Sequence, residues 1–242
     1  MAVELTLHDD LPRFLAKQLR GKAVPPIRLE RRTSIKDFLE ALGIPHPEIH
    51  RLLVNGREQD FACRVGPDDR IEVFGLPLPT DPTLPTPLRL ALPAPRFAVD
   101  ANVGKLAGLL RMTGFDTFFE PTMNDEALAE ISRREQRILL TRDHALLKRK
   151  KVVHGRLVRH HKPIEQLREV IDLYGLRERI EPFSRCLRCN DRLRKVAKEE
   201  IINRLLPLTI KYYDDFRICP RCARLYWPGS HRERMLKIIK EL

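Results

Sequence analysis

The middle of the chain places acidic residues at the ends of apolar runs, where they can act as ligands of a cation. Asp100 directly follows the run 97–99, and Asp143 ends the segment 137–143. Such runs are typical of interior strands in parallel sheets, and open α/β sheets place their chemistry at the carboxyl ends of those strands. A third acid, Asp125 or Glu126, begins a helix for which the preceding asparagine is a suitable N-cap.

Converging carboxylates repel one another unless a cation neutralises them, and Mg²⁺ and Mn²⁺ are hard ions that take oxygen ligands. A bound ion of this kind can generate a nucleophilic hydroxide and stabilise a phosphate during hydrolysis. The acids therefore predict a site for Mg²⁺ or Mn²⁺ at the strand ends. The alternative is structural, with Asp100 and Asp125 capping helices and Asp143 forming a salt bridge.

The clearest chemical signal is a pair of cysteine knuckles near the C-terminus. The spacing Cys-x₂-Cys occurs twice, in Cys186, Cys189, Cys219 and Cys222. Four cysteine sulfurs suit tetrahedral Zn²⁺, so we expect one structural zinc ion here and not a redox pair. The long interval between the knuckles predicts an inserted helix or hairpin. Cys63, the fifth cysteine, is interpreted as a small buried residue.

Lysine and arginine exceed aspartate and glutamate, 45 against 33, which gives a formal net charge of +12. This balance favours a partner rich in phosphate. The cations predicted to contact it flank the acids in the sequence: Lys105, Arg111, Arg142 and Lys148. Arg142 is favoured because it sits beside a key acid, whereas a solvated helix face is the alternative for the basic runs.

Trp227 is the only tryptophan. It could stack on a base, as aromatic residues do in single-strand binding sites. The favoured interpretation is a core role, in which Trp227 locks the cysteine-containing unit against the rest of the protein.

The elements that must position these residues alternate between strand and helix. Strands are expected at 97–99, 115–119, 137–141 and 155–158, and helices at 103–110, from 125, at 145–151 and from Pro163. This alternation predicts a parallel sheet with right-handed crossovers.

The first 75 residues predict a separate small unit. Strands are expected at 3–7, 27–30, 52–54 and 69–74, with a helix capped by Ser34 and closed by Gly43, and a turn at Asn55-Gly56. The order ββαββ is that of a ubiquitin-like β-grasp domain.

A change in composition separates this unit from the next. Seven of the 19 prolines fall between Pro77 and Pro95, which predicts a semi-rigid linker or, alternatively, an extended strap packed along one domain. We therefore divide the chain into the β-grasp unit 1–75, the Pro-rich linker 76–96, the α/β domain 97–175, and the metal-binding unit with its C-terminal helix, 176–242.

Two resemblances to known families add to these inferences. Residues 53–56 and 66–71 resemble the small sulfur carriers of the ThiS and MoaD type, but the chain continues past Gly75, so a docking module is favoured over sulfur transfer. Further segments closely resemble the Mut7-C RNase family, a branch of the PIN-like nucleases that has a ubiquitin-like unit as a companion. These segments are 97–100, 106–111, 114–117, 140–143, 165–168, 185–190 and 226–231.

The second resemblance implies an α/β protein with an N-terminal ubiquitin-like β-grasp domain, a PIN-like domain with a parallel sheet and a C-terminal zinc ribbon. It implies a metal-dependent ribonuclease that hydrolyses RNA phosphodiester bonds. Asp100, Asp125 and Asp143 match its acidic, metal-binding positions. RNA would then be the ligand of the four flanking cations named above.

The alternative function is a non-catalytic RNA-, tRNA- or ribosome-binding factor on the same platform, with a protein partner for the ubiquitin-like domain. No apolar run approaches the ~20 residues that a membrane span needs. The N-terminus, with acids at positions 4, 9 and 10, lacks the order of a signal peptide. We therefore expect a cytoplasmic protein without a membrane partner.

Overall fold

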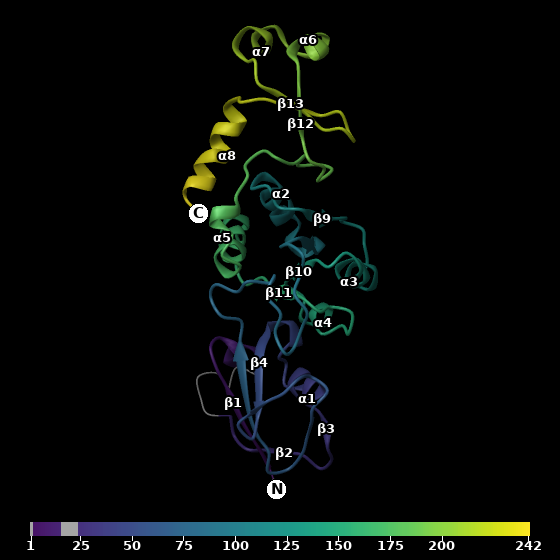
Figure 1. The fold of residues 1–242 in the computed structure, drawn as a ribbon, viewed down its shortest axis with the longest axis vertical. Helices are drawn as coiled ribbons and strands as arrows, with labels where there is room; N and C mark the ends of the chain where they lie inside the picture. The colour runs from purple at the N-terminus through teal and green to yellow at the C-terminus, as the bar shows by residue number, and fades with distance from the viewer. Residues whose placement is uncertain (1, 16–23) are drawn as a thin grey trace.

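The computed structural model describes residues 2–15 and 24–242, apart from the side chains of residues 230–232 and 234. Three units follow one another along the long axis of the molecule (Figure 1). A mixed sheet forms one end, a parallel sheet the middle, and a cysteine-containing lobe the other end. The predicted α/β architecture in three parts is confirmed.

The N-terminal unit is a five-stranded mixed sheet in the order β2-β1-β7-β4-β5. The central pair β1 and β7 is parallel, and the other pairs are antiparallel, which is the ubiquitin-like arrangement predicted. Its strands are β1 Ala2–Leu7, β2 Ile27–Arg28, β4 Ile49–Val54, β5 Arg57–Glu58 and β7 Arg70–Gly75. Its other elements are α1 Ile35–Ala41, η1 Leu11–Phe14, η3 His46–Glu48 and the short pair β3 Thr33–Ser34 and β6 Arg64–Val65.

Local sequence signals account for the turns of this unit. Ser34 caps α1 by accepting a hydrogen bond from the backbone N–H three residues on, at 3.0 Å. Gly43, just after the helix, has a φ of 98°, which favours glycine. The β4–β5 hairpin turns at Asn55 and Gly56, and both have the positive φ that a two-residue type I′ turn requires.

Residues 76–96 form a packed strap and not a free linker. Leu92 is buried in the core of the parallel-sheet unit, whereas Leu88 packs against the core of the N-terminal unit. The guanidinium of Arg89 donates to the carbonyl oxygen of Pro47 at 2.9 Å and to carbonyl oxygens at the start of η3 and of β4. The strap therefore touches both units and holds them together.

The middle unit is a four-stranded parallel sheet in the order β11-β10-β8-β9. Its strands are β8 Phe97–Val99, β9 Thr117–Phe119, β10 Ile138–Thr141 and β11 Gly155–Leu157. Phe97 and Val99 lie in one core cluster and Ala98 in another. Both faces of the sheet are covered, which explains why the strand sequences are continuously apolar.

Helices supply the cover on each face. They are α2 Gly104–Met112, α3 Asp125–Arg134, α4 His144–Leu147 and α5 Pro163–Leu173, with the short η4 Ala101–Val103 and η5 Arg177–Arg179. α2 and α5 share one core cluster with the sheet, and α3 and α4 share the other. α4 is shorter than the helix predicted for 145–151, because the chain turns after Leu147 and buries Val152.

The cysteine-containing lobe is built on the antiparallel sheet β12-β13-β14. Its elements are β12 Arg194–Val196, α6 Lys198–Ile201, η6 Ile202–Arg204, α7 Pro207–Tyr212, β13 Phe216–Ile218, β14 Leu225–Tyr226 and α8 Ser230–Lys240. α8 returns to the middle unit beside α5, where Ile238 and Ile239 contact the core cluster (Figure 1). Within 2–15 and 24–242, no helix has the length and apolar character needed to cross a lipid bilayer.

Candidate functional site

Asp100 and Asp143 lie at the same edge of the parallel sheet. β8 and β10 are hydrogen-bonded neighbours in parallel register, so their carboxyl ends coincide. Asp100 directly follows β8, and its N–H donates to the carbonyl oxygen of Leu140 at 3.0 Å. Asp143 follows β10 by two residues. Strand topology therefore brings these two acids together at the edge where α/β sheets place ligands.

Thr141 and Asn102 connect the two acids. The buried Thr141 hydroxyl donates to Asp100 Oδ2 at 2.6 Å and accepts a hydrogen bond from the Asp143 N–H at 2.9 Å. Asn102 Nδ2 donates to the same Asp100 oxygen at 2.5 Å, and Asn102 Oδ1 accepts from the Arg142 N–H at 3.1 Å. Two donors thus fix one oxygen of Asp100, which sets the direction of the whole carboxylate.

Asp143 has a structural role of its own. Its Oδ1 accepts hydrogen bonds from the N–H groups of Ala145 at 2.7 Å and Leu146 at 3.4 Å, which makes it the N-cap of α4. The structural alternative for this residue is therefore a helix cap and not the salt bridge that the sequence suggested. Because the cap uses Oδ1, the other carboxylate oxygen does not take part in it.

Asp125 is not gathered with the other two acids. It is the first residue of α3, which Asn124 caps by accepting the Ala127 N–H at 2.9 Å, and it lies 3.7 Å from Arg149 Nη2. Its neighbour Glu126 lies 3.6 Å from a lysine on the opposite segment. Among the residues that the structure describes, the three carboxylates do not come within 4.8 Å of one another as a group that could hold an ion.

Two of the four predicted phosphate contacts are accessible beside these acids. The guanidinium nitrogens of Arg142 lie 2.9 and 3.1 Å from the two ring nitrogens of His161, so the side chain is held over the imidazole at the same edge. Lys105 is exposed at the start of α2, which follows β8 through η4. Arg142 thus stands between β10 and Asp143, and Lys105 lies shortly after Asp100 in the chain.

Arg111 corrects one prediction. Its side chain is buried, its Nε donates to the Thr117 carbonyl oxygen, and its Nη1 donates to the carbonyl oxygens of Leu187 and Arg188 at 3.0 and 2.9 Å. Arg111 therefore fastens the first knuckle to the sheet and is not placed to bind RNA. Burial is also the main reason that the pKa of its guanidinium is lowered.

Lys148 is the fourth predicted contact, and it is half-buried. Its Nζ donates to the Glu40 carbonyl oxygen of the N-terminal unit at 3.0 Å. This hydrogen bond crosses the boundary between the two units, so Lys148 has a docking role in addition to any contact with RNA.

Sequence reasoning left Thr141, Asn102 and His161 out of the site. The sequence does hold a signal for Thr141 and Asn102, because each lies two residues from a strand-end acid, in the patterns Thr-x-Asp and Asp-x-Asn. Short polar side chains at that spacing can hydrogen-bond the turn in which they lie. His161 comes from the segment after β11, and no local signal connects it to Arg142.

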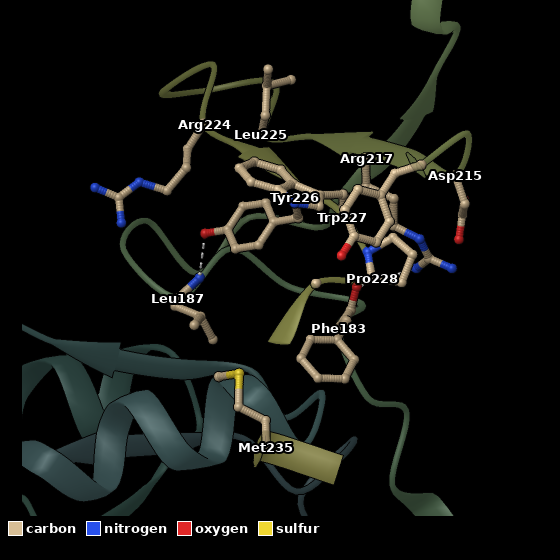
Figure 2. A pocket seen from close by; sticks show the side chains of 12 residues that line it. Phe183, Leu187, Asp215, Arg217, Arg224, Leu225, Tyr226, Trp227, Pro228 and Met235 are labelled. Atoms are coloured by element: carbon tan, nitrogen blue, oxygen red, sulfur yellow. Dashed lines mark hydrogen bonds between the residues drawn. The ribbon is translucent and has the colours of Figure 1, made fainter. Parts of the chain in front are cut away.

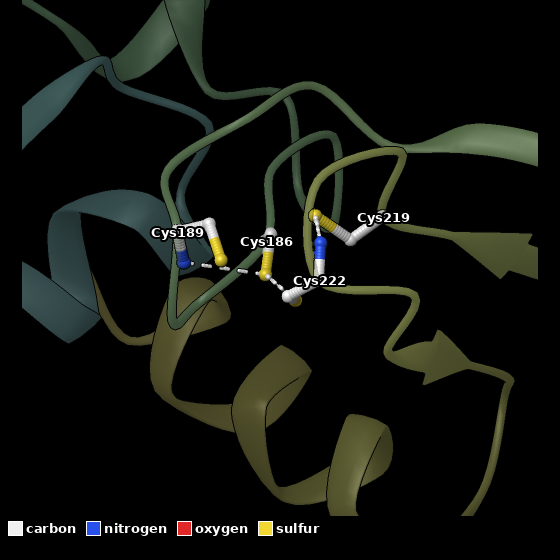
Figure 3. Close-up of side chains that lie close together, drawn as sticks. All are labelled: Cys186, Cys189, Cys219 and Cys222. Carbon is white, nitrogen blue, oxygen red and sulfur yellow. Dashed lines mark hydrogen bonds between the residues drawn. The ribbon is translucent and has the colours of Figure 1, made fainter.

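The four cysteines form the second candidate site (Figure 3). The sulfurs of Cys186, Cys189, Cys219 and Cys222 all lie within 4.8 Å of one another, in a group that can hold a metal ion. The N–H groups of Cys189 and Cys222 point to the first sulfur of their own knuckle, at 3.4 and 3.5 Å. This arrangement fits a structural zinc site.

Each knuckle closes with a residue in the left-handed backbone region. Asn190 has a φ of 69° and Ala223 a φ of 55°. Asparagine adopts this region readily, whereas alanine does so at a cost, which indicates that the turn demands it. The residue after each second cysteine therefore turns the chain back under the sulfurs.

The sulfurs are too close to carry four negative charges without a cation. Hydrogen bonding with Cys222, burial and the neighbouring thiols raise the pKa of Cys189 to about 12. The backbone N–H of Arg224 is the main reason that the pKa of Cys222 is lowered, to about 7. A dication bound among the sulfurs would favour the thiolate form of each, so metal binding releases protons here.

Asp116 fastens the lobe to the opposite end of the sheet from Asp100 and Asp143. It directly precedes β9, and its carboxylate accepts from Arg137 at 2.5 Å and from Asn190 at 2.9 Å. Burial alone would raise the pKa of Asp116, but these hydrogen bonds and the nearby arginines lower it. The cysteine site therefore lies at the amino ends of the strands, and the acidic edge lies at their carboxyl ends.

Comparison with known families separates the N-terminal unit from the rest of the chain. The family model described as the Mut7-C RNAse domain matches residues 95–239, and the model described as Mut7-C ubiquitin matches residues 1–79. No curated protein and no solved structure matches the chain significantly.

Proposed function

The chain belongs to the Mut7-C RNase domain family, and we propose that it is a ribonuclease that hydrolyses RNA phosphodiester bonds with the help of Mg²⁺ or Mn²⁺. The observation that carries this proposal is the pair of carboxylates at the ends of β8 and β10. Asp100 and Asp143 are joined there through the Thr141 hydroxyl. Oxygen ligands of this kind suit both ions.

The side chains around these acids would orient them before RNA arrives. Thr141 and Asn102 hold one oxygen of Asp100, and the α4 cap holds one oxygen of Asp143. Oriented groups need little rearrangement during the reaction, which is the main source of electrostatic catalysis. A bound divalent ion would lower the pKa of a water and offset negative charge on the phosphate.

Asp125 would complete the acidic set. Its carboxylate is 44% exposed and lies 3.7 Å from the similarly exposed Arg149. An exposed ion pair of this kind contributes little to stability, so the side chain can leave its partner at small cost. We infer that Asp125 turns toward the other two acids when an ion is bound.

Arg142 and Lys105 would hold the RNA backbone. The planar guanidinium of Arg142 can form two parallel hydrogen bonds with a phosphate, and His161 restricts its orientation. Lys105 would add a point charge. Arg142→Ala should then weaken RNA binding most at low salt, because each phosphate contact releases counterions.

The decisive test is RNA cleavage by Asp143→Asn. Asparagine also caps helices well, so α4 should persist while a metal-binding charge is lost. We expect cleavage of single-stranded or structured RNA in Mn²⁺ to fall about 100-fold or more. Asp172→Asn is the matched control, since Asp172 lies on α5 and is paired with Arg177 at the surface. Unchanged cleavage by Asp143→Asn would remove this site from the proposal.

A non-catalytic RNA-, tRNA- or ribosome-binding factor is the second candidate. The engagement of Asp125 with Arg149, away from the other acids, favours it. RNA that co-purifies with the protein should be incubated with Mg²⁺ or Mn²⁺ on the protein. Cleavage of that RNA by the wild type and not by Asp143→Asn supports the enzyme, whereas intact RNA supports binding alone.

We also propose that the ion of the four-cysteine site is zinc with a structural role. Four thiolates in a closed set leave no position open for substrate. The hydrogen bonds of Arg111 and Asp116 would hold the first cysteine knuckle in a fixed position against the sheet.

A further inference from the structure

The cysteine-containing lobe has a pocket of about 380 Å³ that the proposed reaction does not use. Figure 2 shows Trp227, Tyr226 and Phe183 around it, with Asp215 and Arg217 on one side and Arg224 on the other. β13, β14 and the turn before α8 supply most of its walls, and Met235 of α8 closes it from below.

Trp227 does not have the core role that the sequence favoured. Trp227 is 40% exposed and forms part of the pocket wall. An indole is expensive to leave in contact with water because of its large apolar surface. An exposed tryptophan in a concave wall therefore indicates a surface that a flat, apolar group covers.

Gly229 keeps the indole close to the backbone. A Cβ at this position would lie 3.2 Å from Trp227 Nε1 and 3.9 Å from the Tyr213 hydroxyl. A larger residue would require the indole to shift by a few tenths of an ångström. The glycine thus allows Trp227 and Tyr213 to approach the same short turn and line one cavity.

Two arginines and Asp215 are the charged residues of the pocket lining, which leaves it a net charge of +1. Arg224 is exposed at one rim, and Arg217 lines the other side, where its Nη1 donates to the Phe183 carbonyl oxygen at 3.2 Å. Aromatic faces combined with arginines are the combination that binds single-stranded nucleic acids. The bases stack on the rings, and the guanidinium groups contact phosphate.

The pocket is also connected to the metal site. The Tyr226 hydroxyl donates to Cys186 Sγ at 3.1 Å. It accepts a hydrogen bond from the Leu187 N–H at 3.0 Å (Figure 2). Tyr226 therefore belongs both to the pocket wall and to the surroundings of the four sulfurs. Order in the cysteine site fixes the position of this ring.

From these observations we propose that the pocket binds an unpaired nucleobase of RNA, stacked on Trp227, with Arg224 and Arg217 holding the adjoining phosphates. This inference rests on the proposed function, which supplies RNA as the ligand. The pocket belongs to the lobe at the amino ends of the strands, away from Asp100 and Asp143. It therefore contributes to binding and selection of single-stranded RNA and not to the hydrolytic step.

The sole tryptophan makes the test direct. The zinc-loaded full chain carrying Asp143→Asn, which should keep the RNA intact, is titrated with a single-stranded oligouridylate and with a duplex RNA of equal length. We expect the single strand to quench Trp227 fluorescence saturably and the duplex to quench it much less, because paired bases cannot enter the pocket. Equal quenching by the duplex, or no quenching by the single strand, would overturn the proposal.

A substitution separates stacking from general attraction to charge. Trp227→Ala should weaken binding of the oligouridylate, measured by anisotropy of a labelled strand, by about tenfold or more. The control is Tyr212→Ala, since Tyr212 is 64% exposed on α7 and does not line the pocket. Equal affinities of the two variants and their parent would contradict the proposal.

The same variants distinguish this proposal from the ribonuclease proposal. If the chain with Asp143 intact fails to cleave RNA but Trp227→Ala still weakens binding, the pocket proposal is supported and the ribonuclease proposal is contradicted. If that chain cleaves RNA and Trp227→Ala changes neither binding nor KM, the ribonuclease proposal is supported and the pocket proposal is contradicted. Where both proposals hold, Trp227→Ala should raise KM and leave kcat nearly unchanged.

Discussion

At the scale of single residues, the hydroxyl of Thr141 decides how the two strand-end acids face each other. It is buried, it donates to Asp100, and it accepts from the N–H of Asp143. A polar group in this position cannot exchange its partners for water when one of them is lost. The geometry of the acidic edge therefore depends on a residue that would not itself contact the RNA.

Thr141→Val should expose this dependence. Valine preserves the shape but leaves one oxygen of the half-buried Asp100 with Asn102 as its remaining donor, and the N–H of the half-buried Asp143 without its acceptor. This should cost about 1–2 kcal/mol of unfolding free energy. RNA cleavage should fall as well, because Asp100 loses one of the two donors that orient its carboxylate. Thr141→Ser is the matched control and should retain most of both properties. Urea unfolding and a cleavage assay on the same preparations measure the two effects, and a fully stable, fully active Thr141→Val would refute this role.

The limits of prediction at this scale have physical causes. Asp100 and Asp143 could be placed at one edge from sequence because strand ends are set by local apolar runs. The use of Arg111 could not be foreseen, because its partners are carbonyl groups of residues 187 and 188, far along the chain. Trp227 was misjudged for a related reason, since only the folded lobe shows that a pocket, and not a core, surrounds it.

At the scale of elements, helix caps and tight turns could be predicted, because the residues that form them lie within the same short segment of sequence. Ser34 and Asn124 cap their helices with their own side chains, and Asn55-Gly56 makes the hairpin turn. The length of α4 and the packing of the strap 76–96 were harder. α4 ends where Val152 is buried in the same core cluster as Leu146 and Leu147, and the strap packs against the N-terminal unit. Proline content and apolar spacing do not encode these tertiary contacts.

The cysteine-containing lobe is the element-scale unit most dependent on an ion. Its own small core consists of Val196, Ile201, Phe216 and Ile218, which is little apolar surface to stabilise three short strands. Zinc binding to such units contributes folding free energy on the order of 10 kcal/mol in isolated modules. The metal site and not the core should therefore determine whether the lobe is folded.

Elemental analysis should find about one zinc per chain in the wild type, as expected for one four-cysteine site. Cys186→Ser should lose the ion, because Cys186 is fully buried and its sulfur accepts hydrogen bonds from Tyr226 and from a backbone N–H. The lobe should unfold with it, which loss of hydrogen-exchange protection in β12 and β13 would report. Asp143→Asn should keep its zinc. Zinc retained by Cys186→Ser, or lost from Asp143→Asn, would contradict the division into two separate sites.

At the scale of the whole molecule, the ubiquitin-like unit is docked on the parallel-sheet unit through buried charges. Glu48 is fully buried; its carboxylate accepts from Arg156 Nη1 at 2.7 Å and from the Leu157 N–H at 2.6 Å. Arg156 also lies 3.2 Å from Glu169, and Arg159 pairs with Asp10. A docking role was expected for this unit, and one of its surfaces is occupied by the same chain. Any protein partner would have to bind elsewhere on it.

Glu48→Ala tests whether this network holds the two units together. Burial raises the pKa of Glu48, while Arg156 and the N–H of Leu157 act in the opposite direction, so the charged carboxylate relies on these partners. Removing it leaves Arg156 with Glu169 alone and the Leu157 N–H without an acceptor. Loss of one member of a buried ion pair typically costs about 3–5 kcal/mol. We expect a destabilisation of this size in urea, together with faster hydrogen exchange at Leu157 and faster proteolysis within the strap 76–96.

Glu58→Ala is the matched control, because Glu58 pairs with Arg51 at the surface and its loss should cost less than about 1 kcal/mol. If the two variants were equally stable and Leu157 stayed protected, apolar contacts and the strap would hold the units together without Glu48.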